Sequence, residues 1–436
     1  MTRIGIIALA AAGLVAGAAS AQDAALRQAV QADYEANLGA LFDHFHRNPE
    51  LSGLEAMTAA RIATELRALG YETTTGVGGH GVVAVLRNGE GPTVMLRADM
   101  DGLPLEETSG LPNASTARQV DRDGVEKPVM HACGHDVHIT ALVGTARQMM
   151  NRRAHWSGTL VLIAQPAEET ISGARAMMQD GLYERFPKPD FAVAFHVSAD
   201  TPTGRIEVPE RIAYSSSDSV DILVRGVGAH GASPHLGVDP VLVASQIVVS
   251  LQSVVSRDIA PLSPGVITVG SIHGGVKHNI IPDRVELQLT VRADDPTVRE
   301  QLLDGIDRVA RGTALALGVP EELAPIVTRS PTQTTAPTIN DPATAAVVRA
   351  AIAERLGERV LHRQPREGMG AEDFSYFIAP ETGVRGVYFA VGGTPTDQIA
   401  DAPSHHSPFF RISPEPAVTT GVAAMVAAAE ALMPAR

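Results

Sequence analysis

Cysteine occurs only once in the 436 residues, at Cys133. A single cysteine excludes a disulfide bond within the chain, so the thiol is buried and inert, part of an intermolecular bridge, or held as a thiolate by a metal. The choice matters because Cys133 lies in the segment VMHACGHDVH (129–138), which also holds three histidines and one aspartate. This segment is therefore the first candidate for chemistry.

Basic side chains are also scarce. The chain has 35 lysines and arginines against 49 aspartates and glutamates, which gives a formal net charge of −14 and a pI near 5.5. This balance excludes nucleic acid and an anionic membrane surface as expected partners. The apolar content of 44% with 19% charged residues is that of an ordinary globular protein, so a sizeable core can form. The sequence has no low-complexity tract and no repeat array.

Long apolar runs are missing except at the N-terminus. Arg3 is followed by an apolar stretch, 4–19, and by an A-x-A site that ends at Ala21. This is the layout of a secretory signal peptide, and the stretch is shorter and richer in Ala and Gly than the ~20 apolar residues of a membrane span. We expect a signal peptide at 1–21, cut after Ala21, and a periplasmic or secreted protein; an uncleaved anchor is the alternative. We expect no later segment to cross a membrane.

The length and the pattern of elements predict two domains. About 415 residues follow the signal peptide, which is more than one core usually serves. Short β-branched runs, expected as strands, alternate with expected helices, which is typical of an α/β domain with a mixed, largely parallel sheet. The expected strands are 81–87, 92–99, 158–165, 190–196 and 386–393, and the expected helices are 23–47, 55–70, 139–150, 173–181, 343–356 and 415–433.

A second pattern occupies residues 214–328. Its order is β-α-β-β-α, which predicts a self-contained α+β layer of one sheet and two helices. Strands are expected at 219–226, 265–272 and 284–293, and helices at 240–257 and 296–318. After a stretch rich in Thr and Pro, 330–342, the α/β pattern resumes. We therefore expect a discontinuous α/β domain, 22–213 and 329–436, interrupted by an inserted domain at 214–328.

Polar side chains follow the predicted strands of the α/β domain. In open α/β sheets, ligands bind beyond the carboxyl ends of the strands. The residues at these ends are Asp99 and Asp101, Glu168 and Glu169, His196, and His405 and His406. The segment 129–138 precedes a predicted helix and joins them at the same rim. Any one of these residues is most often a surface or capping residue, so the prediction of a site depends on their convergence.

The residue types at this rim indicate a metal. Cys, His and Glu are the ligands of a borderline divalent ion such as zinc, with cobalt, manganese and nickel as alternatives. The spacing of Cys133 and His135 around Gly134 lets one tight turn present a thiolate and an imidazole. The adjacent Glu168 and Glu169 suit a division of labour, in which one carboxylate binds the metal and the other takes the proton from a metal-bound water.

Other catalytic motifs are missing. The chain has no H-E-x-x-H and no G-x-S-x-G segment. Two segments, 76–81 and 226–231, match G-x-G-x-x-G, but neither opens a helix directly after a strand, so a dinucleotide site is not expected. A nucleophilic pair of Cys133 and His135 is an alternative, although export to an oxidising compartment makes a reactive thiol hard to keep reduced.

Ten motifs occur in the order found in one family. They are LRADMDGLP, MHACGHDVH, LIAQPAEE, AFHV, GAHGASPH, DPVLVASQIVVSLQSVVSR, HNIIPD, TVR, GAEDFSYF and HHSP. Over about residues 30–430 the chain resembles the dinuclear metal amidohydrolase and carboxypeptidase family, in the branch of hippurate hydrolase, indole-acetyl-amino-acid hydrolases and N-acetyl-diaminopimelate deacetylase. The resemblance implies a zinc-peptidase-like catalytic domain with an inserted lid domain that often dimerises.

The resemblance implies roles for individual residues of the catalytic domain. Two divalent metal ions, with zinc preferred, would be held by Cys133, His135, Glu169, His196 and His406. His405 is a competitor for the last of these positions. Glu168 would act as the general base, and Asp101 would be the carboxylate that orients a metal ligand.

Three residues of the inserted domain also match the family. The resemblance implies that His230 stabilises the oxyanion, often in the active site of the neighbouring subunit, and that Asn279 and Arg292 handle the substrate carboxylate. The chain departs from the family at Gly102, usually Ala, at NIIP, usually NVIP, and in the longer segments 113–127 and 393–404. Either long segment could reshape the entrance for substrate.

The remaining histidines are assigned less directly. The group of His131, Asp136 and His138 consists either of partners of the metal ligands or of helix-start residues. Five histidines match no motif, and we expect them at the surface: His44, His46, His80, His155 and His362.

We therefore expect a metal-dependent hydrolase that cleaves the amide bond of N-acyl amino acids, similar to hippurate or N-acetyl amino acids. A metallo-carboxypeptidase or dipeptidase acting on small peptides is the alternative enzyme. A binding protein that keeps the fold without turnover is a third reading, but it would not need Glu168. The expected partners are such a small substrate and a second subunit, bound through the inserted domain. We expect no nucleic acid and, after signal cleavage, no membrane.

Overall fold

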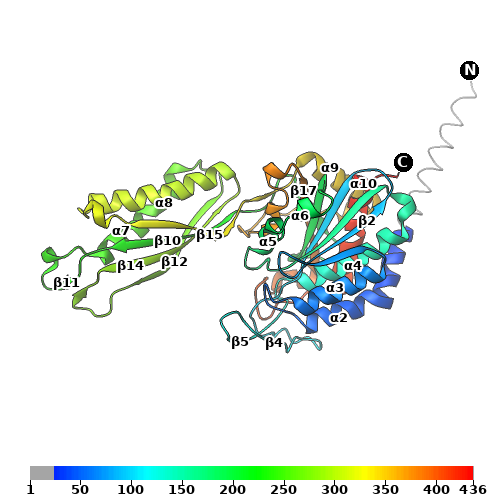
Figure 1. Ribbon diagram of the computed structural model, residues 1–436, viewed down its shortest axis with the longest axis horizontal. Coiled ribbons are helices and arrows are strands. Elements are labelled where there is room, and N and C mark those ends of the chain that lie inside the picture. Colours follow the sequence, from blue (N-terminus) through cyan, green and yellow to red (C-terminus); the bar gives the residue numbers. More distant parts are fainter. Residues whose placement is uncertain (1–23, 436) are drawn as a thin grey trace, which may run out of the picture. The chain divides into compact units, whose positions relative to one another are not determined.

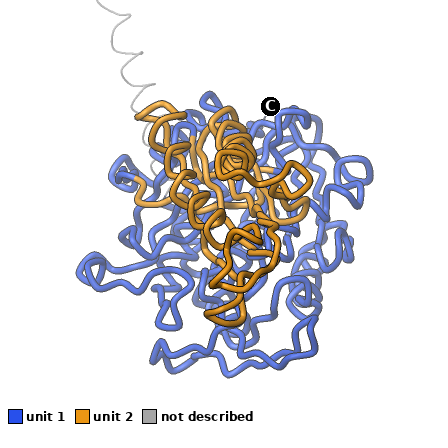
Figure 2. Tube along the Cα trace, turned by 90° about the vertical axis from the view of Figure 1, so that its left-hand side faces the viewer, with its two compact units in different colours: residues 1–211, 339–365, 376–436 blue, residues 212–338, 366–375 orange. Residues whose placement is uncertain are grey.

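The computed structural model describes residues 24–435, so the expected signal peptide lies outside the described residues. The chain forms two compact units, which Figure 2 colours separately. Unit 1 comprises the described parts of 1–211, 339–365 and 376–436, and unit 2 comprises 212–338 and 366–375. Unit 2 therefore interrupts unit 1 twice along the chain.

A seven-stranded mixed sheet forms the centre of unit 1 (Figure 1). The order across the sheet is β1 (Glu72–Val77), β2 (Gly81–Asn88), β6 (Gly158–Gln165), β3 (Thr93–Asp99), β7 (Phe191–Pro202), β17 (Arg385–Thr394) and β8 (Ile206–Glu207). The central strands β6, β3, β7 and β17 run parallel, and antiparallel strands flank them on both sides. The predicted α/β class with a mixed, largely parallel sheet is confirmed.

Helices bury this sheet. They are α2 (Gly39–Arg47), α3 (Ala56–Ala68), α4 (His135–Asn151), α5 (Gly173–Gln179), α6 (Leu182–Arg185), α9 (Pro342–Leu356) and α10 (Pro414–Leu432), preceded by a helical stretch at 24–33 and a π-turn, η1 (Tyr34–Leu38). Strands β3 and β6 are buried along almost their whole length, which is why they are nearly continuous apolar runs and do not alternate. The Ala-rich helix α10 packs against α4, α9 and the central strands.

Unit 2 contains a four-stranded antiparallel sheet with two helices on it. The order is β12 (Gly265–Gly274), β14 (Arg284–Ala293), β10 (Ser217–Arg225) and β15 (Ile326–Thr335), and the helices are α7 (Pro240–Ser253), continued by the π-turn η4 (Val254–Asp258), and α8 (Pro296–Ala316). Buried and more exposed residues alternate along β10 and β14. This period of two is expected when helices cover only one face of a sheet.

Short two-stranded ribbons complete the two units. They are β4 (Arg118–Val120) with β5 (Glu126–Pro128) in unit 1, β11 (Ala229–His230) with β13 (Ile280–Ile281) in unit 2, and β9 (Ile212–Tyr214) with β16 (Thr338–Ile339). The β4–β5 hairpin falls in the segment 113–127 that is longer than usual for the family.

Two strands differ from the sequence-based expectation. Strand β15 occupies part of the Thr- and Pro-rich stretch that was expected to be a connection, and the predicted join at 328–329 lies inside it. Its Pro331 lacks an N–H and is tolerated because β15 is an edge strand whose register with β10 shifts between Arg329 and Thr334. Strand β7 continues to Pro202, beyond the predicted end at His196, because β17 pairs with it past Val197.

Helix α4 begins earlier than predicted, at His135 and not at residue 139. Gly134 precedes it with a φ of 86°, and a Cβ at this position would lie 2.4 Å from Val197 Cγ1. Only glycine fits such a close approach with a positive φ. As a result, His135, Asp136 and His138 occupy the first turn of α4.

Among the described residues, one helix, Pro240–Asp258, is long and apolar enough to cross a membrane by length and composition. The expectation that no later segment meets this test is therefore wrong. The inner face of the helix, with Val243 and Ile247, is buried in the core of unit 2, whereas Leu242 and Val249 are exposed. The helix is thus a surface helix of a folded unit that carries apolar residues on both faces.

Candidate metal centre

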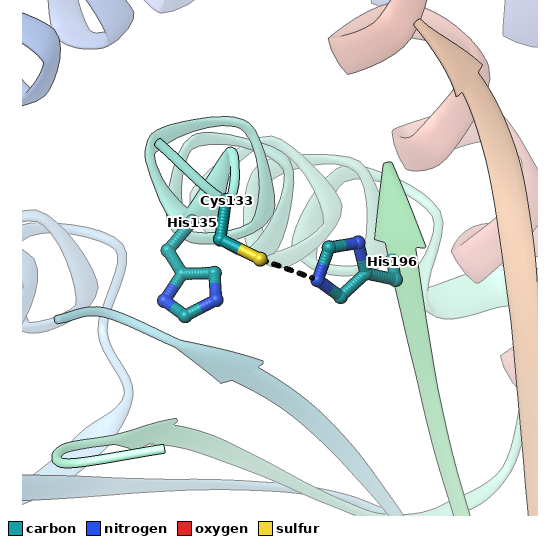
Figure 3. A group of neighbouring side chains, drawn as sticks. All are labelled: Cys133, His135 and His196. Carbon is teal, nitrogen blue, oxygen red and sulfur yellow. Dashed lines mark hydrogen bonds between the residues drawn. The ribbon is translucent and has the colours of Figure 1, made fainter. Parts of the chain in front are cut away.

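Cys133, His135 and His196 meet beyond the carboxyl ends of the parallel strands of unit 1 (Figure 3). Cys133 lies in the turn just before α4, His135 is the first residue of α4, and His196 comes from β7. The pairing of β7 with β3 ends at Ala194, so His196 faces the space that β3 leaves open. Cys133 Sγ lies 3.4 Å from His196 Nε2.

Hydrogen bonds fix which nitrogen of each ring faces the cluster. His135 donates its Nδ1–H to the Asp101 carbonyl oxygen at 2.9 Å, and His196 donates its Nδ1–H to the Val197 carbonyl oxygen at 2.6 Å. Both imidazoles therefore turn Nε2 toward Cys133 and the carboxylates. Backbone carbonyls that hold the second nitrogen in this way are common partners of metal-binding histidines.

The Glu168–Glu169 turn brings two carboxylates to the same place. Its backbone contains Ala167 and Ile171 with a positive φ of 52° each, a conformation that L-residues adopt only when their surroundings impose it. The Asp101 carboxylate accepts the N–H of Glu168 at 3.1 Å and that of Glu169 at 3.0 Å. Asp101 therefore contacts both His135, through its carbonyl oxygen, and this turn, through its carboxylate.

His406 completes the donor set from the other end of the chain. Its Nε2 lies 3.3 Å from Glu169 Oε2, and its backbone N–H donates to the Ala132 carbonyl oxygen at 2.9 Å. The hydrogen bond to Glu169 raises the pKa of His406, although burial opposes it. His406 also has a positive φ of 62°, which turns its side chain toward the carboxylate.

His405, the competing residue, is used differently. Its Nε2 accepts the backbone N–H of Ala199 at 3.1 Å, and its ring packs against His196 and Phe410. Burial, followed by the neighbouring histidines, holds the pKa of His405 well below its usual value. His405 is therefore a neutral ring that packs against His196. The structure brings His406, not His405, to the carboxylates.

The donor atoms fit a divalent metal. In each of three groups, the possible ligand atoms lie within 4.8 Å of one another: Cys133, His135 and His196; Cys133, Glu169 and His406; and His135, Glu168 and Glu169. His135 Nε2 and Glu169 Oε1 are buried without a hydrogen-bond partner among the described residues. Polar atoms are rarely left so unless something else binds them.

Electrostatics at the cluster also favour a cation. Burial, followed by the charges of Glu169 and Glu168, raises the pKa of the Cys133 thiol well above its usual value. Burial lowers the pKa of His135, but the charges of Asp99 and Asp101 outweigh it and raise that pKa to about 10. The charge contributions to both shifts come from buried carboxylates, whose negative charge a bound cation would neutralise.

Asp99 and His138 form a hydrogen-bonded pair beside the cluster that the sequence indicated only in part. His138 accepts the backbone N–H of Val197 at its Nε2, at 2.8 Å, so its Nδ1 carries the proton that is donated to Asp99. Asp99 also pairs with the buried Arg97 at 2.6 Å. His138 therefore ties α4 to the strand segment that carries His196, and its two nitrogens are already occupied.

His46, expected at the surface, is instead buried. Its Nδ1 lies 2.7 Å from Asp136 Oδ2, and its Nε2 lies 3.3 Å from Glu107 Oε1. Burial lowers the pKa of His46, but the two carboxylates outweigh it and raise that pKa to about 10. The prediction was wrong because the sequence around His46 gives no signal of this contact, which joins α2 to a helix about ninety residues later.

The three predicted residues of unit 2 lie on β11, directly before β13, and on β14. His230 in β11 is exposed and pairs with Ile280 of β13, next to Asn279, whose carbonyl oxygen accepts the N–H of Gly231. Arg292 lies on β14, half-buried, and donates to Thr290 Oγ1 and the Val291 carbonyl oxygen. Unit 2 thus brings His230 and Asn279 together and holds Arg292 in its sheet.

The parallel-stranded fold and the Cys, His and Glu donor set of unit 1 define a metal-dependent hydrolase. Residues 95–431 match peptidase family M20/M25/M40 as a family model. The chain belongs to this family, and the resemblance drawn from its motifs is confirmed. Members of the family hydrolyse amide bonds, so the chain is an enzyme of metal-dependent amide hydrolysis.

Individual relatives agree with this assignment. The chain is 36% identical to the hippurate hydrolase of Campylobacter jejuni, over 76% of this chain and 82% of that protein. It is 35% identical to thermostable carboxypeptidase 2 of Saccharolobus solfataricus, over 84% of this chain and 88% of that protein. The crystal structure of the Bacillus subtilis YXEP protein, a dinuclear metal binding peptidase from M20 family, superposes with a TM-score of 0.75 at 27% identity, over 92% of this chain and 98% of that one.

Proposed function

We propose that this enzyme hydrolyses the amide bond between an acyl group and the amino group of an amino acid. The observation that supports the proposal most is the convergence of six donor side chains in unit 1, with His135 Nε2 and Glu169 Oε1 buried and unpartnered among the described residues. The hippurate hydrolase similarity supports an N-acyl amino acid as the substrate class.

Five side chains would hold two divalent ions: Cys133, His135, Glu169, His196 and His406. Zinc suits this mixed thiolate, imidazole and carboxylate set best, and manganese, cobalt or nickel are alternatives. When bound, such ions supply positive charge that lowers the pKa of water and polarises the amide carbonyl. The thiol of Cys133 is then protected from oxidation by its role as a ligand.

Glu168 is the residue that moves the proton. Its carboxylate is buried and lies 3.9 Å from His135 Nε2. Because Asp101 binds the backbone of the Glu168–Glu169 turn, the carboxylate is fixed beside the cluster. It takes a proton from the attacking water and delivers that proton to the nitrogen of the leaving amino acid. General acid–base help of this kind requires a carboxylate within hydrogen-bond reach of both groups.

Unit 2 supplies groups suited to the amino-acid end of the substrate. The planar guanidinium of Arg292 matches the two oxygens of a carboxylate, and Asn279 offers an amide donor. His230, exposed on β11, is placed to donate to a developing oxyanion when it reaches an active site. These roles follow the family resemblance and form part of the proposal.

A carboxypeptidase is the second candidate, because one relative at 35% identity bears that name. Its chemistry at the cluster would be the same, and only the group that precedes the scissile bond would differ. A panel of N-acetyl and N-benzoyl amino acids and dipeptides, assayed by release of free amino acid, separates the two. Cleavage of dipeptides with no cleavage of N-acyl amino acids would select the carboxypeptidase.

The metal requirement is tested directly by a variant and a chelator. Cys133→Ala should lose bound metal and activity together, because it removes a ligand shared by two of the donor groups. Chelation of the unmodified enzyme should abolish turnover, and zinc or another divalent ion should restore it. Full activity of a metal-free Cys133→Ala enzyme would contradict the proposed centre.

A homodimer through unit 2 is part of the proposal. The outer face of α7 carries the exposed Val241, Leu242 and Val249, of which Val249 is 65% exposed. Strand β12 is an edge of the unit 2 sheet and exposes Ile272. Contiguous exposed apolar side chains beside an open strand edge are typical of a surface that another chain covers, and a second copy is the partner we propose.

Export is also proposed, from the N-terminal sequence alone. The charged start, apolar stretch and A-x-A site support cleavage after Ala21 and a periplasmic or secreted location. N-terminal sequencing of the protein purified from its native host should begin at Gln22; a protein that retains Met1 or Thr2 would contradict the proposal.

A further inference from the structure

The turn that carries Glu168 is strained and needs support. Ala167 and Ile171 both have a positive φ, and a Cβ on Gly173 would lie 1.5 Å from the Pro166 carbonyl oxygen. Such a backbone persists only where neighbouring groups determine it. The groups that hold this turn therefore decide where the Glu168 carboxylate points.

Three consecutive N–H groups of the turn are bound by two buried carboxylates. Asp101 accepts those of Glu168 and Glu169, and Glu55 Oε1 accepts that of Ala167 at 2.8 Å. Glu55 is fully buried, and the same oxygen also accepts the N–H of Gly53 at 2.6 Å. Unlike Asp101, Glu55 makes no hydrogen bond to a proposed metal ligand within the part of the chain that the structure describes.

Glu55 is not used to cap its own helix. It occupies the N-cap position of α3, yet its side chain accepts no N–H of that helix. Glu50 does so instead, accepting the N–H of Met57 at 3.2 Å and of Thr58 at 2.7 Å. A carboxylate at a helix start normally binds the first turn, so the orientation of Glu55 toward Ala167 points to another purpose.

The loop before Glu55 is held by the β4–β5 hairpin. Gln119 in β4 accepts the N–H of Leu51 at 2.6 Å and donates to the Leu54 carbonyl oxygen at 3.1 Å. In the same loop, Ser52 Oγ donates to Asp101 Oδ2 at 2.6 Å. The hairpin thus acts on the loop, the loop carries Glu55, and Glu55 holds the turn, all within unit 1.

We propose that Glu55 is a positioning residue that fixes the general base Glu168 through the N–H of Ala167, and that Gln119 supports it by holding its loop. The inference rests on the proposed role of Glu168 as the base. Glu55 touches neither the metal ligands nor the reacting atoms, so it acts on turnover only through the position of the turn.

The chemistry of Glu55 provides a matched variant. Burial, followed by the charge of Asp101, raises the pKa of Glu55 to about 7, and its second oxygen has no hydrogen-bond partner among the described residues. Because Oε1 alone makes the contacts to Gly53 and Ala167, an amide oxygen in its place can accept both N–H groups. Glu55→Gln keeps that oxygen and the side-chain shape, whereas Glu55→Ala removes both.

The test measures kcat, KM and metal content of purified enzyme. Glu55→Ala should lower kcat by about tenfold to a hundredfold, the effect of a small misplacement of a catalytic group, with KM and bound metal nearly unchanged. Glu55→Gln should restore kcat to within about threefold of the unmodified enzyme. Glu50→Ala is the control, because it removes the α3 cap and should lower Tm without lowering kcat.

A double-mutant cycle separates positioning from general damage. In a Glu168→Gln background, Glu55→Ala should cause little further loss, because the group that it positions is already disabled. Equal losses in both backgrounds, or a loss of metal with Glu55→Ala, would overturn the inference. If Glu168→Gln itself retains full activity, the proposed function fails, whatever Glu55 does.

A second variant covers the case in which Glu55→Ala does not fold. Gln119→Ala leaves Glu55 intact and removes only the hydrogen bonds that hold its loop, so kcat should fall less than in Glu55→Ala. As with Glu55→Ala, this fall in kcat should occur only in enzyme that retains Glu168. An unchanged kcat in Gln119→Ala, with the hydrogen bonds of the loop lost, would show that the hairpin has no part in positioning. A kcat loss of the same size in the Glu168→Gln background would contradict the positioning role of the loop.

Discussion

Glu168 and Glu169 are adjacent in the chain, yet the turn gives their carboxylates different neighbours. Glu169 lies 3.3 Å from His406 and shares a donor group with Cys133. Glu168 lies 3.9 Å from His135 Nε2 and shares a donor group with His135 and Glu169. The backbone thus gives two identical side chains different surroundings, and substitutions can test the separate roles proposed for them.

Glu168→Gln should keep the metal content and lower kcat by about 10²–10⁴-fold, because an amide cannot accept the proton from water. Glu169→Gln should instead lower metal occupancy, since an amide oxygen is a weaker ligand than a carboxylate. Metal analysis of both purified variants, together with turnover, checks the pair. The reverse pattern would show that the two roles are exchanged.

Arg292→Ala should raise KM sharply for substrates with a free α-carboxylate and hardly at all for their amides. The reason is the loss of a planar donor pair that matches two carboxylate oxygens. Arg284→Ala, an exposed change on the same strand, is the matched control and should leave both KM values unchanged. An equal rise in KM for acids and amides would argue against carboxylate recognition by Arg292.

The sequence predicted the residues that act through local motifs, and it missed those that act through the fold. Cys133 and His135 are two residues apart, Glu168 and Glu169 are neighbours, and these pairs follow predicted strands or precede a helix, so their expected convergence indicated a metal site. Glu55 contacts Ala167 although the two lie more than a hundred residues apart in the chain, and no local sequence pattern predicts such a contact. His46 was missed for the same reason.

At the scale of elements, α4 is the part on which the site is built. It begins with His135, and each of its first-turn polar residues is anchored to a different part of unit 1: His138 to Asp99 of β3, and Asp136 to His46 of α2. The position of the helix start therefore depends on the buried charges around His46. This dependence makes stability sensitive to pH.

The His46 contribution to stability should be largest between about pH 5 and 6.5. The pKa of His46 rises from 6.5 to about 10 on folding, so its stabilisation is complete below pH 6.5 and is lost as the pH rises through about 10. The pKa values of Asp136 and Glu107 are lowered, so their share is lost in acid.

His46→Gln should therefore reduce the free energy of unfolding by about 3–5 kcal/mol near pH 6, because two buried carboxylates lose their partner. The deficit should shrink toward pH 10. Urea unfolding at several pH values measures it, and His44→Gln, an exposed change on the same helix, should show no such dependence. A deficit that is constant from pH 6 to pH 10 would contradict the ion pair.

Helices and strands were predictable where they are buried along nearly their whole length and are therefore strongly apolar. Strands β3 and β6 and helix α10 are strongly apolar and were expected almost at their observed ends. Strand β15 was missed because it is an edge strand rich in Thr with a proline, so its sequence lacks an apolar pattern. The start of α4 was missed because Gly134 and the contact with Val197, not propensity, determine it.

At the scale of the whole molecule, unit 2 carries groups that the proposed reaction uses in an active site. If the unit dimerises, His230 of one subunit can serve the partner's cluster. Mixing inactive His230→Ala with inactive Glu168→Gln subunits should then restore about a quarter of the activity, since half the dimers are hybrids with one intact site.

The hybrid experiment needs subunit exchange, which native mass spectrometry can monitor. Val249→Glu on the exposed face of α7 should prevent both dimer formation and the return of activity. Exchange without any recovery would show that His230 acts within its own subunit or has no role.

The proposed donor set of unit 1 extends from Cys133 to His406 along the 436-residue chain. Cys133 and His135 are made before unit 2 is synthesised, and His406 only after it. Because domains of a growing chain fold from the N-terminus onward, the nascent protein carries an exposed thiol and an imidazole long before the last ligand leaves the ribosome. Complete metal loading is therefore a late event of biosynthesis, and a chain truncated before β17 would remain an inert, oxidisable fragment that lacks any hydrolytic activity.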